Sequence, residues 1–412
     1  MLFEPFRTSV YRAADAVCAC SCGTDKLNAV PRLARGCPQE PPVGPRSFET
    51  PLKDRTASVP EGSTRKEAHM SDTTNGQPWT PGGFAYCEIA VGNADHAADW
   101  FRDRYGFQLR ENGPEDWNKT PGERSHVLGQ GGVTLAVTGA LRPESPVADF
   151  VRAHGDGVRD VGLAVDDPED AFHRAVQRGA SPGAAPLSID VLGAYTYTFV
   201  AEADGPVQSG GPSSLSSIDH LACALEYGDL DRWADFHVDV LGFDILMKET
   251  TDTGRSSMHS IVVRDPRSGA TLTFVSPGAP GDRSQISEFL EHNGGPGVQH
   301  VAFASDDICQ AVDRFTDSGA EFLRAPAAYY EVLDQRVPAL SGEIGRLRDR
   351  SILADQDESG ELLQIFTRPV SGRPTLFFEV IERRGGSKGF GAGNIKALFQ
   401  AVEAEQLRRG TL

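Results

Sequence analysis

The chain consists of short apolar runs separated by longer stretches in which apolar residues recur at helical spacing. Continuous or alternating apolar runs of about four to eight residues are typical of β-strands. They predict strands at 133–137, 217–222, 270–275, 297–303 and 375–381. Apolar residues spaced like Ala171, Ala175 and Val176 lie on one side of a helix, so helices are predicted between the strands.

The order of the predicted elements occurs twice. Each copy begins with an apolar strand, continues into a helix and a Gly-Phe pair, and later has a second strand that ends in Asp-Asp and leads into another helix. The first copy has its predicted helices at 94–105 and 168–178, and the second has them at 230–240 and 308–318. Matched positions lie 134 and 140 residues apart (220 − 86 and 300 − 160), which indicates an internal repeat.

Three polar residues lie within apolar strands of the second copy: His220, His300 and Glu379, spaced by 80 and 79 residues (300 − 220 and 379 − 300). A single histidine in such a strand is usually a hydrogen-bonded core residue, but a buried charge needs a partner. Two imidazoles and one carboxylate on one face also form the ligand set that holds Fe(II) and leaves other positions open. The first copy has Tyr86 and Asp160 at the two histidine positions. We therefore expect one metal site, in the second copy, and a scaffolding role for the first.

Length, charge and cysteine content narrow the class of protein. The 412 residues are enough for two domains with full cores. A net charge of −18 argues against nucleic acid and anionic membrane surfaces as partners. No apolar run of about 18 residues occurs, so no transmembrane helix is expected. The distribution of the seven cysteines does not suggest a disulfide framework, which favours a cytoplasmic location.

Residues 1–69 differ in composition from the rest of the chain. They are rich in Pro, Arg and Ser, lack periodicity and have no apolar core of the length that a signal peptide needs, so a disordered leader is predicted and Met70 is an alternative start. Cys18, Cys20 and Cys22 offer ligands for zinc, but their spacing is not that of paired CxxC ligands.

Five motifs carry a resemblance to a known family. They are IDH at 218–220, GVQHVAF at 297–303, LLQIFT at 362–367, FFEVIER at 377–383 and GFGAGN at 389–394. With these motifs, residues 80–412 resemble the 4-hydroxyphenylpyruvate dioxygenase family of the vicinal-oxygen-chelate superfamily over their whole length.

The resemblance implies an α+β fold of two tandem vicinal-oxygen-chelate domains, in which paired βαβββ modules form an open barrel. The expected order is a leader at 1–79, an amino-terminal domain without metal at 80–203, a linker at 204–216, and a catalytic domain at 217–412 that ends in a lid helix at 393–409. The linker is rich in Gly, Pro and Ser.

The resemblance also implies the chemistry. Fe(II) is the expected cofactor, with His220, His300 and Glu379 as its ligands, and 4-hydroxyphenylpyruvate and O2 are the expected small-molecule substrates. A homodimer is the expected assembly. The family contains two activities on this substrate: a dioxygenase, which hydroxylates the ring and forms homogentisate, and 4-hydroxymandelate synthase, which hydroxylates the benzylic carbon and whose product serves antibiotic biosynthesis.

Pocket positions separate the two activities. The dioxygenases have Phe where this chain has Ile395, and a Pro-x-Asn pattern where it has Thr273-Phe274-Val275. A flat Phe holds the substrate ring by stacking, whereas a branched Ile changes the shape of the pocket. A displacement of about 1 Å is enough to change a rate on the order of 100-fold. These differences predict hydroxymandelate formation, and homogentisate formation is the alternative.

Further residues are expected at the substrate. Ser260 lines the pocket in both activities, Gln364 is expected to hold the keto acid, and Gln285 is expected to reach the phenol. Gln299 precedes a ligand, so strand alternation predicts that its side chain points to the opposite face. Asn394 is also expected to bind the substrate, and three aromatic residues are predicted to wall the cavity and exclude water: Phe366, Phe378 and Phe390.

Three other interpretations fit part of the sequence. A non-catalytic binding protein of the same architecture would be favoured by loss of the triad, which is intact. A ring-cleaving extradiol dioxygenase shares the ligand set, but the carboxy-terminal lid motif does not suit it. A nucleotide-binding loop at 389–394 lacks the third Gly of GxGxxG, because Lys396 stands there; a hinge for the lid is the better interpretation.

Overall fold

The computed structural model describes residues 83–110, 120–193, 195–201, 213–252, 256–281, 284–391, 393–395, 397–398 and 402. The predicted leader with its cysteine cluster, most of the predicted linker and most of the lid helix beyond residue 398 lie outside these residues. The described part contains two sheets, one in each half of the chain.

The first half follows the predicted order of strand and helix. Its elements are β1 (Phe84–Val91), α1 (Ala94–Tyr105), β2 (Gln108–Leu109), β3 (Glu123–Gln130), β4 (Val133–Ala140), α2 (Pro146–His154), β5 (Gly157–Val165), α3 (Pro168–Gln177), β6 (Ser188–Val191) and β7 (Tyr195–Ala201). The seven strands form one sheet in the order β2-β3-β4-β1-β5-β7-β6.

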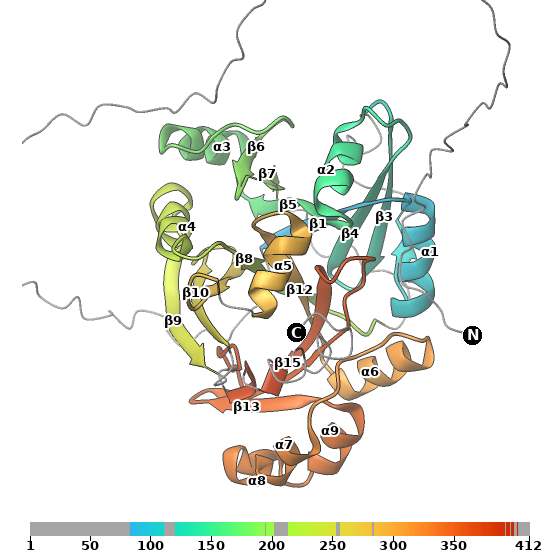
Figure 1. Ribbon diagram of the computed structural model, residues 1–412, viewed down its shortest axis with the longest axis vertical. Coiled ribbons are helices and arrows are strands. Elements are labelled where there is room, and N and C mark those ends of the chain that lie inside the picture. Colours follow the sequence, from blue (N-terminus) through green and yellow to red (C-terminus); the bar gives the residue numbers. More distant parts are fainter. Residues whose placement is uncertain are drawn as a thin grey trace, which may run out of the picture. The chain divides into compact units, whose positions relative to one another are not determined.

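The second half repeats this order and extends it (Figure 1). Its strands are β8 (Ser217–Ala224), β9 (Asp244–Asp252), β10 (Ser257–Arg264), β11 (Thr271–Pro277), β12 (Gly297–Ala304), β13 (Leu353–Asp357), β14 (Gly360–Phe366) and β15 (Phe377–Arg383). Its helices are α4 (Leu230–Phe236), α5 (Gln285–Asn293), α6 (Ile308–Asp317), α7 (Ala327–Glu331), α8 (Leu333–Arg336) and α9 (Ile344–Arg350). A π-turn, η1 (His237–Leu241), continues α4, and a 3-10 turn, η2 (Pro338–Leu340), follows α8.

The two sheets have the same strand order. The second sheet runs β13-β14-β15-β12-β8-β11-β10-β9, so β8 takes the place of β1, β12 that of β5 and β15 that of β7. The register is also repeated, because Tyr86 pairs with Gly162 as His220 pairs with Ala302. The prediction of two tandem domains of one α+β fold is therefore confirmed.

The Asp-Asp and Gly-Phe pairs that mark the repeat in the sequence lie at the ends of helices. Asp167 and Asp307, the last residues of the two Asp-Asp pairs, cap α3 and α6 by accepting the backbone N–H three residues on. Gly106 and Gly242 end α1 and η1 with φ angles of 72° and 80°, a region that favours glycine. These caps explain why the predicted helices 94–105, 168–178 and 308–318 lie within one residue of their observed bounds.

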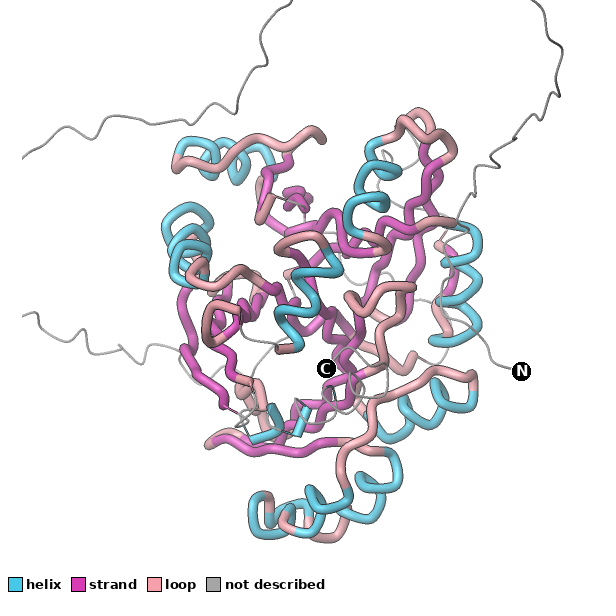
Figure 2. Tube along the Cα trace, viewed as in Figure 1, coloured by secondary structure: helices cyan, strands magenta, loops and turns pink. Residues whose placement is uncertain are grey.

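One hydrophobic core joins the two halves. Phe101 and Tyr105 of α1 contact the ring of Phe378 on β15 with centroid distances of 5.6 and 5.9 Å. The other face of the second sheet, which runs from β13 at one edge to β9 at the other, curves toward the helical residues 393–395 and 397–398 (Figure 2). The sheet thus has one face in the shared core and one face toward this segment.

A helical insertion is present in the second half only. α7, α8 and α9 lie together beside β13, the added edge strand (Figure 1). In the first half, the ten-residue stretch 178–187 leads directly from α3 to β6. The insertion buries Tyr329 and Tyr330, and sequence patterning did not predict it.

Candidate metal centre

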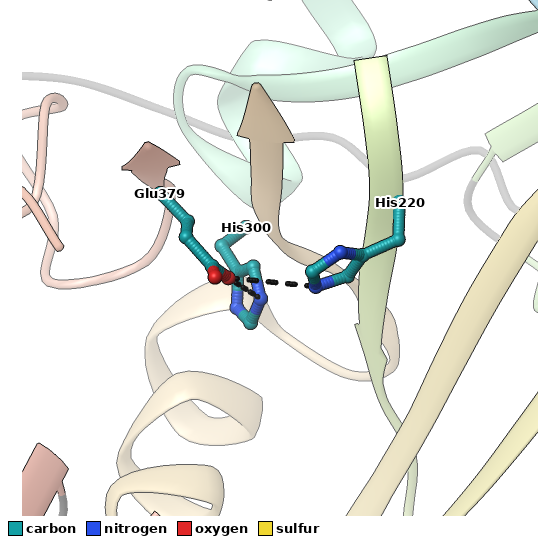
Figure 3. Close-up of side chains that lie close together, drawn as sticks. All are labelled: His220, His300 and Glu379. Carbon is teal, nitrogen blue, oxygen red and sulfur yellow. Dashed lines mark ion pairs between the residues drawn. The ribbon is translucent and has the colours of Figure 1, made fainter. Parts of the chain in front are cut away.

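Three neighbouring strands carry the residues predicted to bind metal. His220 lies on β8, His300 on β12 and Glu379 on β15, and these strands are adjacent in the sheet. The Nε2 atoms of both histidines lie 3.4 Å from Oε2 of Glu379, and one potential ligand atom from each residue lies within 4.8 Å of the others (Figure 3). Within the described part of the chain, this is the one group of His, Cys, Asp or Glu residues with such geometry.

Strand pairing explains why these residues meet. Ala302 on the central strand pairs with His220 on one side and with Glu379 on the other. His300 lies two positions before Ala302 and therefore shares its face of the sheet. The small Ala302 side chain leaves the space between the three polar groups open.

The centre is buried, and its charges depend on each other. Burial by itself lowers the pKa of His220, but the negative charges of Glu379 and Asp219 outweigh it and raise the pKa to about 9. Burial raises the pKa of Glu379, but His220 and His300 outweigh it and lower the pKa to about 2. Burial lowers the pKa of His300. The centre therefore places a carboxylate between two imidazoles, a donor set that suits a divalent transition metal.

A buried ion pair orients His220. Its Nδ1 lies 2.8 Å from Oδ1 of Asp219, which is fully buried. Asp219 in turn accepts two hydrogen bonds of 2.8 and 2.9 Å from the Arg383 guanidinium, which keeps the pKa of Asp219 well below its usual value although burial opposes this. A histidine held at Nδ1 by a carboxylate presents Nε2 to a metal.

Glu379 is oriented by amides. Nε2 of Gln364 donates to Oε1 of Glu379 at 2.9 Å, and Nδ2 of Asn394 donates to Oε1 of Gln364 at 2.9 Å. Oε2 of Glu379 is the oxygen that faces both histidines. Gln364 and Asn394 thus hold the carboxylate in one rotation.

The centre opens into a cavity that holds nearly all of the predicted pocket residues. Ser260, Thr273, Val275, Gln285, Gln364, Phe366, Phe390, Asn394 and Ile395 all line it. The cavity also contacts Met247, Met258, Val262 and Ile286, which were not predicted. These are apolar residues on strands and a helix, and the sequence offers no signal that distinguishes them from ordinary core positions.

The prediction that Phe378 walls the cavity is wrong. Phe378 lies on the opposite face of β15 from Glu379 and packs against Phe101, Tyr105 and Phe303 in the core shared by the two halves. Strand alternation separates adjacent residues in this way. Phe377 is the residue on the ligand face, and it stacks on His300 with a centroid distance of 4.9 Å.

The prediction for Gln299 is also wrong. Strand alternation predicted that its side chain points away from the site, but Gln299 lines the cavity. The pairing between β12 and β8 skips from Val298 to His300, so Gln299 is the extra residue of a β-bulge. A bulge lets two consecutive residues face the same side. A single sequence does not reveal such a bulge.

Asp219 was part of a predicted motif but was given no role. It is also a bulge residue, because the register between β12 and β8 skips from His220 to Ile218. A charged residue inside an apolar strand and beside a candidate ligand was the available signal.

The first half has a closed cluster at the matching positions. Tyr86, Asp160 and Thr198 correspond to His220, His300 and Glu379 by strand and register. The Asp160 carboxylate accepts hydrogen bonds from the hydroxyls of Tyr86, Thr196 and Thr198. Hydroxyl donors therefore occupy the space that the two imidazoles and the carboxylate enclose in the second half.

A larger hollow of about 720 Å³ lies elsewhere, between α3 and η1. Its charged residues include Asp170 and Arg174, which pair with each other, and Asp265 and Arg267, which do the same. It contains no candidate ligand set and does not contact the triad. None of the described helices is long and apolar enough to cross a membrane.

Comparison with known proteins identifies the family. A model of the Glyoxalase/Bleomycin resistance protein/Dioxygenase superfamily matches residues 83–205 and 217–335. The 4-hydroxyphenylpyruvate dioxygenase of Yarrowia lipolytica is 32% identical over 372 residues, which cover 80% of this chain and 93% of that protein. A probable 4-hydroxyphenylpyruvate dioxygenase 2 of Aspergillus fumigatus is 34% identical and covers 80% of this chain and 95% of its own. The chain belongs to the 4-hydroxyphenylpyruvate dioxygenase family.

A solved structure adds a second activity to the comparison. A triple mutant of 4-hydroxymandelate synthase from Streptomyces coelicolor is 37% identical, with a TM-score of 0.70, and the match covers 80% of this chain and all of that one. The protein is therefore an oxidoreductase of a family whose relatives carry the names of both enzymes. The resemblance drawn from the five motifs is confirmed at this level.

Proposed function

We propose that the protein uses Fe(II) to convert 4-hydroxyphenylpyruvate and O2 into 4-hydroxymandelate and CO2. His220, His300 and Glu379 supply two imidazole nitrogens and one carboxylate oxygen, the set that is typical of non-haem Fe(II) oxygenases with open positions. When bound there, Fe(II) would hold the keto acid and activate O2. The remaining residues bind and orient the substrate.

The cavity supports a 2-oxo acid with a phenol ring. Its wall near the triad is polar, with Gln299 and Gln364, whereas Phe366 and Phe390 cover the site and exclude water. The Gln364 amide already binds Glu379 and Asn394, so one N–H of Gln364 is left for the keto acid. Toward β10 and β11, the hydroxyl of Thr273 has no partner among the described residues and offers a hydrogen bond to the substrate.

One observation carries the choice of product: Ile395 and Val275 lie in the same apolar cluster at the cavity, together with Met258 and Ile286. Both residues are aliphatic at positions where the resemblance implies Phe and Asn for the homogentisate-forming dioxygenases. Without an aromatic face at 395, the substrate ring is not held by stacking. We infer that the ring settles so that the benzylic CH2 lies nearest to the reacting oxygen.

Identification of the product tests this proposal. Homogentisate and 4-hydroxymandelate are isomers, and both form with consumption of one O2 and release of one CO2, so gas exchange does not separate them. The purified protein, stripped with a chelator and reloaded with Fe(II), is given 4-hydroxyphenylpyruvate and O2, and the aromatic product is identified by NMR. We expect 4-hydroxymandelate. Homogentisate as the main product would contradict the proposed activity and favour the reaction in the names of the fungal relatives.

Protein reloaded with Zn(II) serves as the control for the metal. Zn(II) accepts the same nitrogen and oxygen ligands but has no redox chemistry. We expect no product with Zn(II), and turnover at the level of the Fe(II) protein would remove Fe(II) from the proposal.

A further inference from the structure

A chain of buried hydrogen bonds connects Glu379 to the helical insertion. From Glu379, it passes through Gln364 to Asn394 at 2.9 Å for each bond. Oδ1 of Asn394 then accepts the hydroxyl of Tyr329 on α7 at 2.6 Å. The Tyr329 oxygen itself accepts the backbone N–H of Ala354 on β13 at 2.7 Å. A candidate metal ligand is thus joined to a helix that the first half lacks.

The donors and acceptors give this chain a direction. An amide side chain donates at its nitrogen and accepts at its oxygen, so either end can face a given partner. The N–H of Ala354 occupies a lone pair of the Tyr329 hydroxyl, and the hydroxyl hydrogen has Oδ1 of Asn394 at 2.6 Å and the carbonyl of Ala354 at 2.8 Å as acceptors. Donation to Oδ1 fixes which end of Asn394 faces Gln364.

The orientations of the Asn394 and Gln364 amides decide whether a nitrogen or an oxygen of Gln364 faces the Glu379 carboxylate. If Asn394 turned over, its oxygen would face the oxygen of Gln364. Gln364 would then turn its own oxygen toward the carboxylate, and two acceptors would oppose each other in a buried site. In the observed arrangement, an N–H binds Oε1 of Glu379 and Oε2 remains turned toward the histidines.

The carboxy-terminal segment is fitted against this chain. Gly391 adopts a φ angle of 71°, and a Cβ at this position would collide with the Gln364 amide. The backbone N–H of Gly393 donates to Asp355 on β13 at 2.8 Å. Asn394 is therefore placed by β13 and by Tyr329, and both of its hydrogen-bonding ends are engaged within the protein.

We propose that Tyr329 is a positioning residue for Glu379 and acts through Asn394 and Gln364. The inference rests on the proposed role of Glu379 as a metal ligand, and it replaces the predicted substrate contact of Asn394 with a role in holding the ligand. Partners of metal-ligating groups commonly contribute about 10- to 100-fold in metal affinity. Because Tyr329 acts through two side chains, we expect an effect near the lower end.

The test compares Tyr329→Phe with Tyr330→Phe. Tyr330 is the next residue of α7, is equally buried, and donates to the carbonyl of Ile352 at 3.0 Å without contact to Asn394. Each variant loses one hydroxyl at the same helix, and Tyr329→Phe is expected to lose more thermal stability, because it also leaves the N–H of Ala354 without its partner. Binding of Fe(II) without oxygen, and of Co(II) followed by its visible absorption, is measured for both. Tyr329→Phe is expected to bind about tenfold more weakly, with a changed Co(II) spectrum. Tyr330→Phe is expected to match the wild type.

A double-mutant cycle with Asn394→Ala checks the route. If Tyr329 acts through Asn394, then Tyr329→Phe adds no further loss of metal affinity once Asn394 is Ala. Equal metal affinity in Tyr329→Phe and Tyr330→Phe, or additive losses in the double variant, would overturn the inference. A wild-type protein that binds neither metal would overturn the proposed function itself, and this is seen before any variant is compared.

Discussion

The two halves of the protein have the same strands in the same register, but they use the three facing positions in opposite ways. In the first half, three hydroxyls donate to the single carboxylate of Asp160 and close the cluster. In the second half, two imidazoles converge on Oε2 of the Glu379 carboxylate, and Nδ1 of His300 has no hydrogen-bond partner among the described residues. The comparison teaches that this backbone supports either a sealed polar core or an open donor set, and that the side chains at three positions decide between them.

The β-bulges of the two halves show the same contrast. In the first half, β1 and β5 each have a bulge, with Ala85 and Arg159 as the extra residues. In the second half, β8 and β12 each have one, with Asp219 and Gln299 as the extra residues. Arg159 binds the buried carboxylates of Glu88 and Glu123, which ties strands together. Asp219 binds Arg383 and His220, which orients a candidate ligand.

Replacing matched residues at the ligand position is expected to give the largest difference. Glu379→Gln keeps the shape of the side chain but removes the anionic oxygen, so we expect metal affinity to fall by more than about 100-fold, beyond the effect of an outer partner. Thr198→Val, at the matching position of the first half, is expected to leave metal affinity unchanged. Metal titration of the two variants measures the difference, and equal losses would show that the halves share the site.

Removing the two arginines that pair with buried carboxylates separates stability from metal binding. Arg383→Met leaves Asp219 buried without its cation and is expected to lower the free energy of unfolding by about 3 to 5 kcal/mol. Arg159→Met is expected to cost about 3 kcal/mol, because its side chain is partly exposed. Denaturant unfolding gives both values. Only Arg383→Met is expected to weaken metal binding as well, and an equal loss in Arg159→Met would contradict the division of roles.

A change of product is expected from a single residue of the carboxy-terminal segment. Ile395→Phe places an aromatic ring at the apolar end of the cavity, where it can stack on the substrate. We expect the ratio of homogentisate to 4-hydroxymandelate to rise by up to about 100-fold, the effect of a displacement near 1 Å. Ile395→Leu is the control, since it keeps an aliphatic side chain. An unchanged ratio in Ile395→Phe would show that residue 395 does not select the product.

The smallest effect is expected where the two halves meet. Arg373 donates to the carbonyls of Arg152, Ala153 and His292 at 3.3, 2.9 and 3.0 Å, near the carboxy-terminal ends of α2 and α5. Arg373→Ala removes these three bonds and is expected to lower the free energy of unfolding by about 1 kcal/mol. Arg368→Ala, which removes a nearby exposed ion pair with Glu321, is expected to change it by less. A loss of metal affinity in Arg373→Ala would show that the junction also shapes the site.

Much of the fold was predictable because its signals are local. Apolar runs marked the central strands, and Asp and Gly caps marked the ends of the repeated helices. The insertion with α7, α8 and α9 was not predicted, since its helices are short and take their stability from packing on β13 rather than from a long periodic pattern. Phe378 and Gln299 were misplaced because neighbouring strands, and the bulges between them, decide which face a side chain takes.

The sequence by itself determined the family, the repeat and the three residues of the candidate metal centre, because these depend on residue identity and spacing. The tertiary structure decided what supports them. The ion pair between Arg383 and Asp219, which supports His220, joins positions 164 residues apart, and the hydrogen bond from Tyr329 to Asn394 joins positions 65 residues apart. Hydrogen bonds at such separations form only when strands from distant parts of the chain pair, and a pattern read along one sequence carries no record of that pairing.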